Sequence, residues 1–442
     1  MEGAQAYITK SVDFKFRGKG FSFALSQGLF SAAAIDRGTE FLLKVLSRQW
    51  DAQTGQGLPL PKTVLDAGCG VGVIGVCVAG ALWTPDANLD LERHVHCQDR
   101  DELATVITRY NARQNHIPEG LLSSHTEPLL AGPPHARWDL ILSNIPAKAG
   151  EPVLRDFIVR SAALLNPKGS VLVVVVAPLG DFFYRQITQA NLSLQYDELG
   201  KRHRVFMYGP SATPSPPVKP VVGGGYLLRD YPMYHRRQGE YILEDLAYSL
   251  DTIQGAADFN TPSQAVQVAA KLVRRLPSDL FQRTPLGSIL IYEPGQGHFP
   301  RWLLAYLAQN RVLGEASSDR CWVLFGRNIL ALEASRYALS GERVLAIPGL
   351  DLAIDHKRLK EALRPEGYGF DLLVGFPQFV PQTKRLIPLW EGLGELLSPR
   401  GLAIIALPAS EAERFDRKKP LGFTRLGDCK RKGFRALAIC RA

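Results

Sequence analysis

Short apolar runs and segments with helical periodicity alternate along the first half of the chain. The apolar runs begin at residues 63, 94, 138 and 170 and are rich in Val, Ile and Leu. Amphipathic or small-residue segments that favour helices lie between them at 73–82, 103–114 and 153–165. Nearly continuous apolar strands joined by helices are typical of a mainly parallel sheet covered on both faces. Residues 1–209 are therefore predicted to form a doubly wound α/β domain.

The second half of the chain repeats the pattern of the first. The apolar run and glycine-rich turn at 64–72 match residues 289–298, and later landmarks recur at offsets between 227 and 232 residues. Matches in the same order at a nearly constant offset indicate an internal duplication. A Pro-rich and Gly-rich segment, 210–225, separates the copies and has the composition of a semi-rigid linker. The expected fold class is α/β, with two tandem Rossmann-like domains at 1–209 and 226–442.

The first apolar run ends in a turn that contains one acid and three glycines. Asp66, Gly68, Gly70 and Gly72 have the spacing D-x-G-x-G-x-G, and a helix is expected directly after them. Glycines let the backbone turn tightly and approach a ligand closely. A carboxylate would repel the pyrophosphate of a dinucleotide at a helix N-terminus. It suits S-adenosylmethionine (SAM), which has an ammonium, a sulfonium and ribose hydroxyls but no phosphate.

Polar residues also follow other strands at the same edge of the expected sheet. Asp99 ends the second strand, where it can accept both ribose hydroxyls of a nucleoside. Glu127 lies where a third residue could meet the adenine. Asn144 ends the fourth strand in an Asn-Ile-Pro turn, which is also a common way for a strand to lead into a helix. With Asp66, these residues define a candidate site at the carboxyl edge of the sheet.

These motifs resemble those of class I SAM-dependent methyltransferases, in particular the "methyltransferase small" group, which includes ribosomal RNA guanine-N2 methyltransferases. Residues 65–72 match the first SAM motif of the family, and residues 99–115 match the acid and helix that follow its second strand. Residues 143–146 fall where the family has Asn-Pro-Pro followed by an aromatic residue. Residues 28–39 are similar to the segment that leads into the SAM site of this group.

The resemblance implies SAM as the cofactor and assigns residues to it. Asp66 and Gly68 would meet the methionine end, Asp99 the ribose, and Glu127 the adenine amine. The residues expected to bind the cofactor are Asp66, Gly68, Gly70, Gly72, Asp99, Arg100, Glu127 and Phe30.

The resemblance also implies a catalytic turn. The residues expected to form it are Asn144, Ile145 and Pro146. Asn144 would accept a hydrogen bond from the target amino group, aided by the carbonyl of Ile145, and so aim the nitrogen lone pair at the methyl group. The chain departs from the family at Ile145, which replaces the first proline, and at Ala147, which replaces an aromatic residue that stacks on a flat substrate. Phe30 and Tyr184 are candidates to supply that stacking.

The second copy has lost most of these residues. In the match at the glycine turn, the third glycine becomes His298, while Glu293 keeps an acid. Gly326 and Phe376 stand where the first copy has its ribose-binding acid and its catalytic amide. The second domain is therefore interpreted as a degenerate copy that does not bind SAM. In the resembled group the active copy is normally the C-terminal one, so the order is reversed here.

Positive charge is concentrated in the second half. Residues 1–209 contain 21 Lys and Arg against 20 Asp and Glu, whereas residues 226–442 contain 30 against 23. A basic half beside a neutral half suggests an anionic partner such as RNA, although an ordinary solvated surface can have a similar excess. The stretches that could contact phosphates are 236–237, 271–275, 414–419 and 430–432.

The remaining features predict a cytoplasmic protein. The start of the chain lacks a basic region followed by an apolar core, and the longest strongly apolar run, 171–177, is too short to span a bilayer. The six cysteines show no C-x-x-C spacing, which favours reduced thiols over disulfides or zinc ligands. The expected state is a monomer with an internal pseudo-dimer, without a metal or a membrane partner.

These features together predict a transferase that methylates an exocyclic amine of structured RNA, with rRNA guanine N2 as the leading substrate and rRNA processing as its role. One alternative substrate is a protein side-chain amide or a small molecule, which the missing aromatic residue at Ala147 favours. A second alternative is an RNA-binding scaffold without activity, in which the Asn-Ile-Pro turn is a sign of decay.

Overall fold

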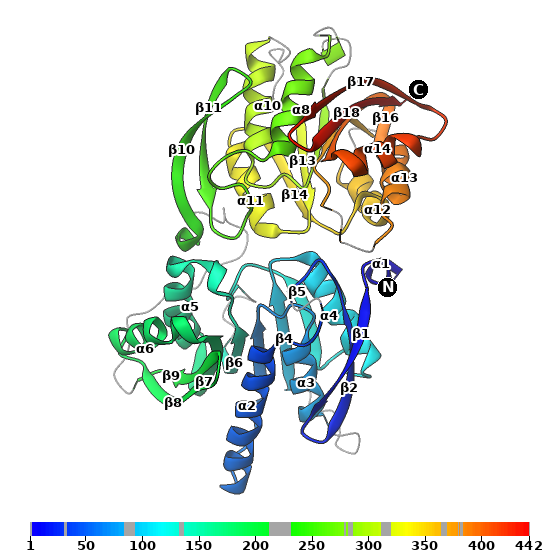
Figure 1. Ribbon diagram of the computed structural model, residues 1–442. Helices are drawn as coiled ribbons and strands as arrows, with labels where there is room; N and C mark the ends of the chain where they lie inside the picture. The colour runs from blue at the N-terminus through cyan, green and yellow to red at the C-terminus, as the bar shows by residue number, and fades with distance from the viewer. Residues whose placement is uncertain are drawn as a thin grey trace. The chain divides into compact units, whose positions relative to one another are not determined.

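The computed structural model divides the chain into two compact units that meet in sequence at residues 225 and 226. Each unit is built around its own sheet (Figure 1). The expected linker, 210–225, lies almost entirely outside the described residues. The structure describes residues 2–30, 33–83, 93–131, 137–211, 231–277, 280–281, 286–310, 320–363, 369–378, 380 and 383–441.

The first unit contains a seven-stranded sheet in the order β5-β4-β3-β6-β7-β9-β8. Neighbours from β5 to β7 pair in parallel, and β9 and β8 complete the sheet with antiparallel pairing. The strands are β3 (Thr63–Ala67), β4 (His94–Asp99), β5 (Leu122–Thr126), β6 (Trp138–Asn144), β7 (Leu165–Val176), β8 (Ser193–Leu199) and β9 (His203–Gly209). The strand order reverses between β3 and β6, and in such sheets ligands bind beyond the carboxyl ends of the strands at that point.

Helices connect these strands, and a hairpin precedes them. The helices are α1 (Glu2–Gln5), α2 (Arg37–Gly55), α3 (Val73–Leu82), α4 (Glu102–Gln114), α5 (Glu151–Ala163) and α6 (Gly180–Gln189), and the hairpin is β1 (Lys10–Phe16) with β2 (Lys19–Leu25). α5 and α6 cover one face of the sheet, where Phe157 and Phe183 pack in one core with Phe206 of β9. No helix among the described residues is long and apolar enough to cross a membrane.

The elements predicted for the first unit are confirmed, with one shift. The strand predicted to begin at residue 170 begins at Leu165. Residues 166–169 form an irregularity within β7, because the pairing of β6 with β7 passes from Trp138–Leu165 directly to Leu140–Ser170.

The second unit has the same topology as the first. Its sheet has the order β14-β13-β12-β15-β16-β18-β17, which is the first sheet with each strand replaced by its counterpart. The elements are β10 (His235–Leu243), β11 (Leu246–Ile253), α8 (Gln264–Arg275), β12 (Ser288–Tyr292), α10 (His298–Gln309), β13 (Cys321–Gly326), α11 (Ile329–Ala338), β14 (Arg343–Pro348), α12 (Leu352–Ala362), β15 (Phe370–Gly375), α13 (Leu386–Leu396), β16 (Leu397–Pro408), α14 (Ala409–Arg417), β17 (Phe423–Arg431) and β18 (Phe434–Arg441). The predicted fold class of two tandem Rossmann-like domains is confirmed.

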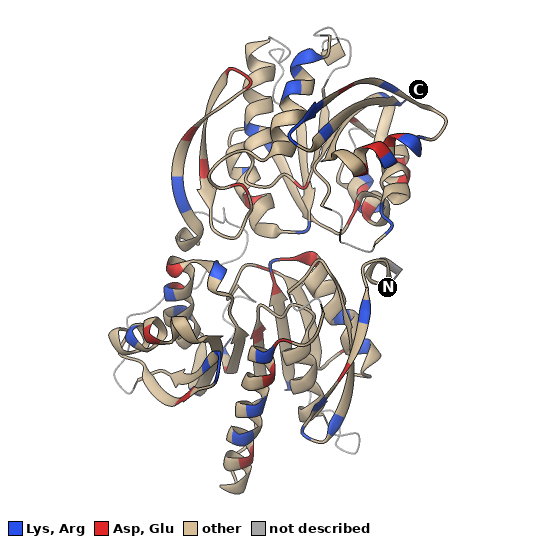
Figure 2. Ribbon diagram, viewed as in Figure 1, with Lys and Arg blue, Asp and Glu red and all other residues tan. Residues whose placement is uncertain are grey.

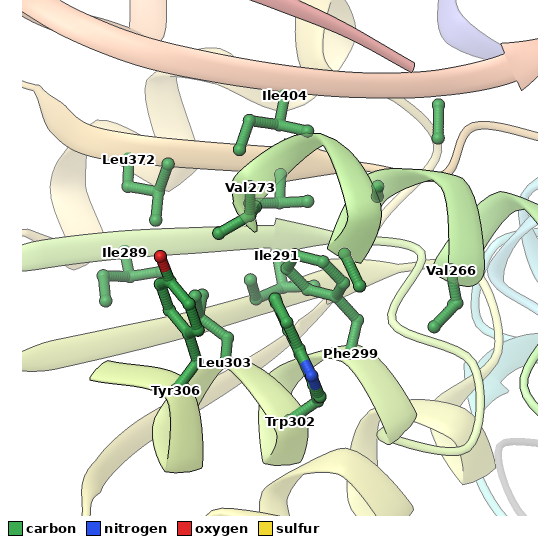
Figure 3. Close-up of a cluster of buried hydrophobic side chains, with 14 of the residues drawn as sticks. Val266, Val273, Ile289, Ile291, Phe299, Trp302, Leu303, Tyr306, Leu372 and Ile404 are labelled. Atoms are coloured by element: carbon green, nitrogen blue, oxygen red, sulfur yellow. The ribbon is translucent and has the colours of Figure 1, made fainter. Parts of the chain in front are cut away.

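A large aromatic core stabilises one face of the second sheet. Figure 3 shows Trp302, Phe299 and Tyr306 of α10 beside Ile289 and Ile291 of β12. The Trp302 ring stacks on Tyr306 with centroids 5.2 Å apart, and its indole N–H donates to the Leu243 carbonyl at 2.9 Å. The core therefore joins α10 both to the sheet and to the β10–β11 hairpin.

One aspartate joins three segments at the amino-terminal edge of the first sheet. A carboxylate oxygen of Asp139, in β6, accepts the backbone N–H groups of Lys62 and Thr63 at 2.8 and 3.1 Å. The other oxygen accepts the Asn166 side-chain amide at 2.7 Å. These donors stabilise the charged form and lower the pKa of Asp139, although its partial burial acts in the opposite direction.

The second unit repeats this arrangement with a counterpart aspartate. Asp371, in β15, accepts the backbone N–H groups of Gly287 and Ser288 at 3.0 and 3.1 Å, and the Ser398 hydroxyl at 3.2 Å. The repeat of a specific hydrogen-bond pattern supports the duplication more strongly than the shared topology, because strand order alone is common to many α/β proteins.

Replacement of these aspartates should destabilise each unit separately. Asp139→Ala leaves the strand-end amides without their acceptor, so we expect the unfolding free energy of the first unit to fall by about 1–3 kcal/mol. Asp371→Ala should do the same to the second unit. Chemical denaturation followed by hydrogen exchange in each half measures both. An equal loss in both halves from either single variant would contradict this assignment.

Candidate functional site

The glycine turn between β3 and α3 has one face open and one face packed. Gly68, Gly70 and Gly72 have φ values of 82°, 57° and 85°, a left-handed conformation that favours glycine. A Cβ atom at Gly68 or Gly70 would meet no described atom within 4 Å, whereas one at Gly72 would lie 2.8 Å from Thr108. The first two glycines therefore leave surface that a ligand can approach, and the third allows α3 and α4 to pack closely.

α4 holds this turn in place from behind. The Thr108 hydroxyl donates to the Gly70 carbonyl at 3.2 Å, and the Asn111 amide donates to the Val71 carbonyl at 2.8 Å. Asn111 also accepts the backbone N–H of Ala24 at 2.8 Å, which ties the end of β2 to the same helix. Three segments that are distant in sequence are thus fixed around one turn.

Asp66 lies buried beneath the turn. Its Oδ2 atom accepts the backbone N–H of Gly75, in the first turn of α3, at 2.8 Å. Its Oδ1 atom is buried without a hydrogen-bond partner among the described residues. Burial raises the pKa of Asp66 to about 7, with a smaller increase from the nearby Asp99 carboxylate, and the Gly75 hydrogen bond opposes both. One oxygen therefore caps the helix, and the other can receive a donor from a ligand or a water molecule.

Asp99 joins the end of β4 to the same turn. Its carboxylate accepts the backbone N–H groups of Gly70 and Asp101, both at 3.0 Å. Burial and the Asp101 carboxylate raise the pKa of Asp99. Arg100, the next residue, is exposed. The expected ribose-binding acid and the glycine turn are thus in direct contact.

Glu127 lies beside Asp99 at the end of β5. Its backbone N–H donates to the Asp99 carbonyl at 2.9 Å, and its carboxylate lies 3.3 Å from Nε2 of the buried His96. His96 also stacks on His125, with ring centroids 4.6 Å apart, so two histidines lie near this strand end. The backbone geometry therefore groups Glu127 with Asp99, as the sequence predicted.

Asn144 is held at the end of β6 by two residues from the start of α2. Its side-chain N–H group donates to the Asp36 carboxylate at 2.8 Å and to the Thr39 hydroxyl at 3.0 Å. A carboxylate can only accept, so the nitrogen of the amide must face Asp36 and the Oδ1 atom must face the other way. Asp36 is itself fixed, because it caps α2 by accepting the N–H groups of Gly38 and Thr39. The amide oxygen is therefore oriented as an acceptor for another group.

Asp36 and Thr39 contact Asn144, although the sequence indicated only that residues 28–39 are similar to the segment that leads into the SAM site. The sequence signal for them was an N-cap, since an acid before a helical segment is a common helix start. Their contact with Asn144 spans more than 100 positions in the chain, and nothing in the local pattern indicates it. The neighbouring Ser143 hydroxyl donates to the Ala67 carbonyl at 2.7 Å, which joins the end of β6 to the strand that leads into the glycine turn.

The other predicted residues have different environments. Ile145 is buried in the core, whereas Pro146 is exposed. Phe30 is 65% exposed, and Tyr184 is 46% exposed with the Arg204 guanidinium 5.9 Å from its ring centroid. Stacking by either ring on a substrate stays a prediction. Among the described residues, no group of three or more His, Cys, Asp and Glu side chains could hold a metal ion.

The second copy of the turn corrects the residue match made from the sequence. Left-handed φ values of 55°, 62° and 92° occur at Glu293, Gly295 and Gly297, directly before α10, in the pattern of the first turn. The third glycine is therefore retained as Gly297, and the prediction that it became His298 was wrong. Glu293 stands in place of the first glycine, and Ile291 stands in place of Asp66.

Glu293 fills space that is open in the first copy. It has a side chain where Gly68 has none, and its carboxylate accepts the backbone N–H of Arg327 at 3.1 Å. A Cβ atom at Gly326, the counterpart of Asp99, would lie 3.1 Å from the Glu293 carboxyl carbon. A side chain at position 326 would therefore press on the Glu293 carboxyl group, and the glycine leaves room for it.

His298 is a core residue of the second unit. Its Nε2–H group donates to the Asp258 carbonyl at 3.0 Å, which leaves Nδ1 to accept the Tyr248 hydroxyl at 2.9 Å. Burial lowers the pKa of His298 to about 4, so the ring is neutral at physiological pH. Both ring nitrogens therefore have hydrogen-bond partners within the protein.

A family model and two curated relatives each match part of the chain. A family model, the methyltransferase small domain, matches residues 20–192. Uncharacterized protein YbxB of Bacillus subtilis is 28% identical over 163 residues, which cover 37% of this chain and 72% of that protein. Ribosomal RNA small subunit methyltransferase C of Haemophilus influenzae is 27% identical over 180 residues, which cover 40% of this chain and 43% of that protein. This match thus spans less than half of the Haemophilus protein.

A solved structure matches both units. The T. thermophilus 16S rRNA N2 methyltransferase RsmC, in complex with AdoMet and guanosine, aligns with a TM-score of 0.59. The alignment covers 99% of this chain and 100% of that chain at 16% identity. At this identity the likeness concerns the fold, and it extends to the tandem arrangement of two units.

The buried Asp66 carboxyl group should make the first unit sensitive to pH. Its pKa rises from near 4 in the unfolded chain to about 7 in the folded one, so the folded state holds the proton more tightly. The stability it contributes is complete below about pH 4 and is lost as the pH rises through about 7. Relative to Asp66→Asn, which cannot ionise, the wild type should lose roughly 2–4 kcal/mol over that range. Denaturant titrations of both proteins at several pH values measure this difference, and parallel pH profiles would contradict it.

Proposed function

We propose that the first unit, whose residues 20–192 match the model of the methyltransferase small domain, transfers a methyl group from SAM to an exocyclic amine of structured RNA, with guanine N2 of ribosomal RNA as the target. The single observation that carries this proposal is the fixed orientation of Asn144 beside the glycine turn. The Haemophilus relative, an rRNA methyltransferase by name, supports RNA as the substrate class.

The residues present fit SAM as the cofactor. The open surface over Gly68 and Gly70 gives the ligand a close approach to the backbone. The unpartnered Asp66 Oδ1 atom is a buried acceptor that the ligand ammonium, directly or through water, would satisfy. Asp99 and Glu127 supply carboxylates for the ribose and the adenine amine. When bound, SAM supplies an electrophilic methyl group.

The chain's own contribution to catalysis is alignment of the nucleophile. Asn144 Oδ1 accepts an N–H of the target amine, and this hydrogen bond fixes the direction of the nitrogen lone pair. Asp36 and Thr39 act as positioning residues, because they prevent the amide from rotating. Correct alignment of two reactants can lower a barrier by roughly 7–11 kcal/mol, so a strong base is not required.

The orientation of the amide also narrows the substrate class. An acceptor oxygen at this position requires a nucleophile that carries a hydrogen atom. An exocyclic amine meets this requirement, whereas a ring nitrogen with only a lone pair does not. The geometry thus favours an amine such as guanine N2 over ring nitrogens that carry no hydrogen atom.

The second unit is proposed to bind RNA without catalysing transfer. Ile291 provides no carboxylate in place of Asp66, and Glu293 occupies the surface over the first position of the turn. Phe376 provides no amide in place of Asn144 and is buried against Phe299 with ring centroids 5.2 Å apart. The excess of Lys and Arg in this half supports a role toward an anionic partner. This assignment describes a cytoplasmic enzyme with one active unit and one supporting unit in each chain.

SAM binding should depend on the first unit alone. Asp66→Ala and Asp99→Ala remove carboxylates of the first site, so we expect each to weaken SAM binding at least tenfold, about 1.4 kcal/mol, in calorimetric titration. Glu293→Ala is the matched control in the second copy and should leave affinity and stoichiometry unchanged at one SAM per chain. Absence of binding to the wild type, or equal affinity in all variants, would refute the cofactor assignment.

Methyl transfer should require Asn144 and its two supports. Asn144→Ala should reduce kcat by about 100-fold or more with SAM affinity retained, because alignment is lost while the cofactor site is intact. Asp36→Ser keeps a helix-capping side chain but removes the carboxylate, and Thr39→Val removes the hydroxyl. Both should lower kcat more than they raise KM, whereas Thr39→Ser should restore the rate.

The assay is transfer of labelled methyl groups from SAM to purified ribosomal RNA, followed by nucleoside mass analysis. Label that survives ribonuclease but is released by protease would replace RNA with a protein substrate. SAM binding without transfer to RNA, protein or small molecules would instead support a non-catalytic scaffold.

A further inference from the structure

Two basic stretches of the second unit, far apart in sequence, come together in the fold. α8 packs against β17 and β18, and Figure 2 shows basic residues on α8 and on β17. Nη1 of Arg275, the last residue of α8, lies 3.6 Å from the Cys429 sulfur in β17. The basic side chains at these two segment ends form what we call the α8–β17 surface. It consists of Lys271, Arg274, Arg275, Lys430, Arg431 and Lys432.

The turn between β10 and β11 orders two arginines of this surface. Arg274 donates to the backbone carbonyl of Glu244, and Arg431 lies 3.6 Å from the Glu244 carboxylate. The carboxylate of Asp245 lies 3.8 Å from Arg274 and is itself largely exposed. These two acids are the ones that form ion pairs with the surface among the described residues, so the six basic side chains retain a net positive charge.

The basic stretch at 414–419 differs from the α8–β17 surface in its ion pairs, although the sequence analysis listed both as possible phosphate contacts. In α14, Arg414 pairs with Glu411 at 3.1 Å and Arg417 pairs with Glu413 at 2.8 Å. These are pairs within one helix at three- and four-residue spacing, and each neutralises one arginine locally. Two of the four cations of this stretch are thus paired within α14, whereas two acids face the six cations of the α8–β17 surface.

We propose that the α8–β17 surface binds RNA phosphates and contributes most of the substrate affinity of the second unit. Its exposed cations, Arg275, Lys430 and Lys432, can displace the counterions of a phosphate backbone. Arg274 and Arg431 are held by Glu244, which reduces the conformational entropy that these two side chains lose when they bind. A favourable interaction with the negative end of the α8 dipole would explain why Arg274 and Arg275 are basic. It would not explain the lysines at the end of β17. This inference rests on the proposed RNA substrate.

The test compares two triple variants with the same charge change. Arg275→Gln, Lys430→Gln and Lys432→Gln remove three cations from the surface, and Arg414→Gln, Arg417→Gln and Lys418→Gln remove three from α14. Binding of the full-length protein to purified ribosomal RNA is measured by fluorescence anisotropy at several salt concentrations. We expect the first variant to bind at least tenfold more weakly, with the slope of log affinity against log salt reduced by about 2–3. The α14 variant should resemble the wild type.

Four outcomes have distinct meanings. Equal losses in the two variants would overturn the proposal in favour of a general charge effect, and unchanged binding in both would overturn it as well. If the wild type itself fails to bind RNA, the proposed RNA substrate fails, and the surface proposal falls with it. A lower melting temperature of the first variant, with RNA binding unchanged, would assign these cations to the stability of α8 instead. Charge-preserving Lys430→Arg and Lys432→Arg should keep full binding.

Discussion

The hydrogen bonds from α4 to the glycine turn are the interaction on which the candidate site depends. Three glycines in the left-handed region have little intrinsic preference for one path, because glycine is the most flexible residue. Thr108 and Asn111 fix that path through the carbonyls of Gly70 and Val71. Asp99 adds a third bond through the N–H of Gly70. With the turn fixed, the surface over the first two glycines has a defined shape, and the carboxylates around it have defined distances.

The duplicated unit shows which of these interactions serve the fold and which serve the site. Ser335 donates to the Gly295 carbonyl at 3.3 Å in the second unit, which repeats the support of Gly70 by Thr108. Asp371 repeats the strand-end bonds of Asp139. Residues at the carboxyl edge of the sheet, in contrast, have changed to Ile291, Glu293 and Phe376. The hydrogen bonds behind the turn and at the amino-terminal edge of the sheet are thus retained, whereas the residues at the carboxyl edge differ. This pattern agrees with the proposal that the second copy kept the fold and does not catalyse methyl transfer.

The sequence predicted the architecture well for two reasons. The apolar runs that form the strands are visible in short stretches of sequence, and the same pattern recurs in the second half of the chain. The grouping of Asp66, Asp99 and Glu127 could be predicted because each of these residues lies at the carboxyl end of a predicted strand or directly after one. Two features were beyond this reasoning. The sequence comparison matched Glu293 to Asp66 because both are acids, whereas the backbone conformation shows that Glu293 occupies the position equivalent to Gly68. The support of Asn144 by Asp36 and Thr39 joins distant segments through side chains, so only the folded chain reveals it.

The residues that differ between the two units at this edge of the sheet also affect the stability of each unit. The first unit keeps a buried carboxyl group with one unsatisfied oxygen, which is costly in a low-dielectric interior. The second unit has Ile291 at that position and Phe376 packed into its core. At this one position the first unit therefore carries a free-energy cost that the second unit does not. A ligand that satisfies Asp66 would stabilise the first unit by mass action, so cofactor supply would set how long the enzyme resists unfolding in the cell.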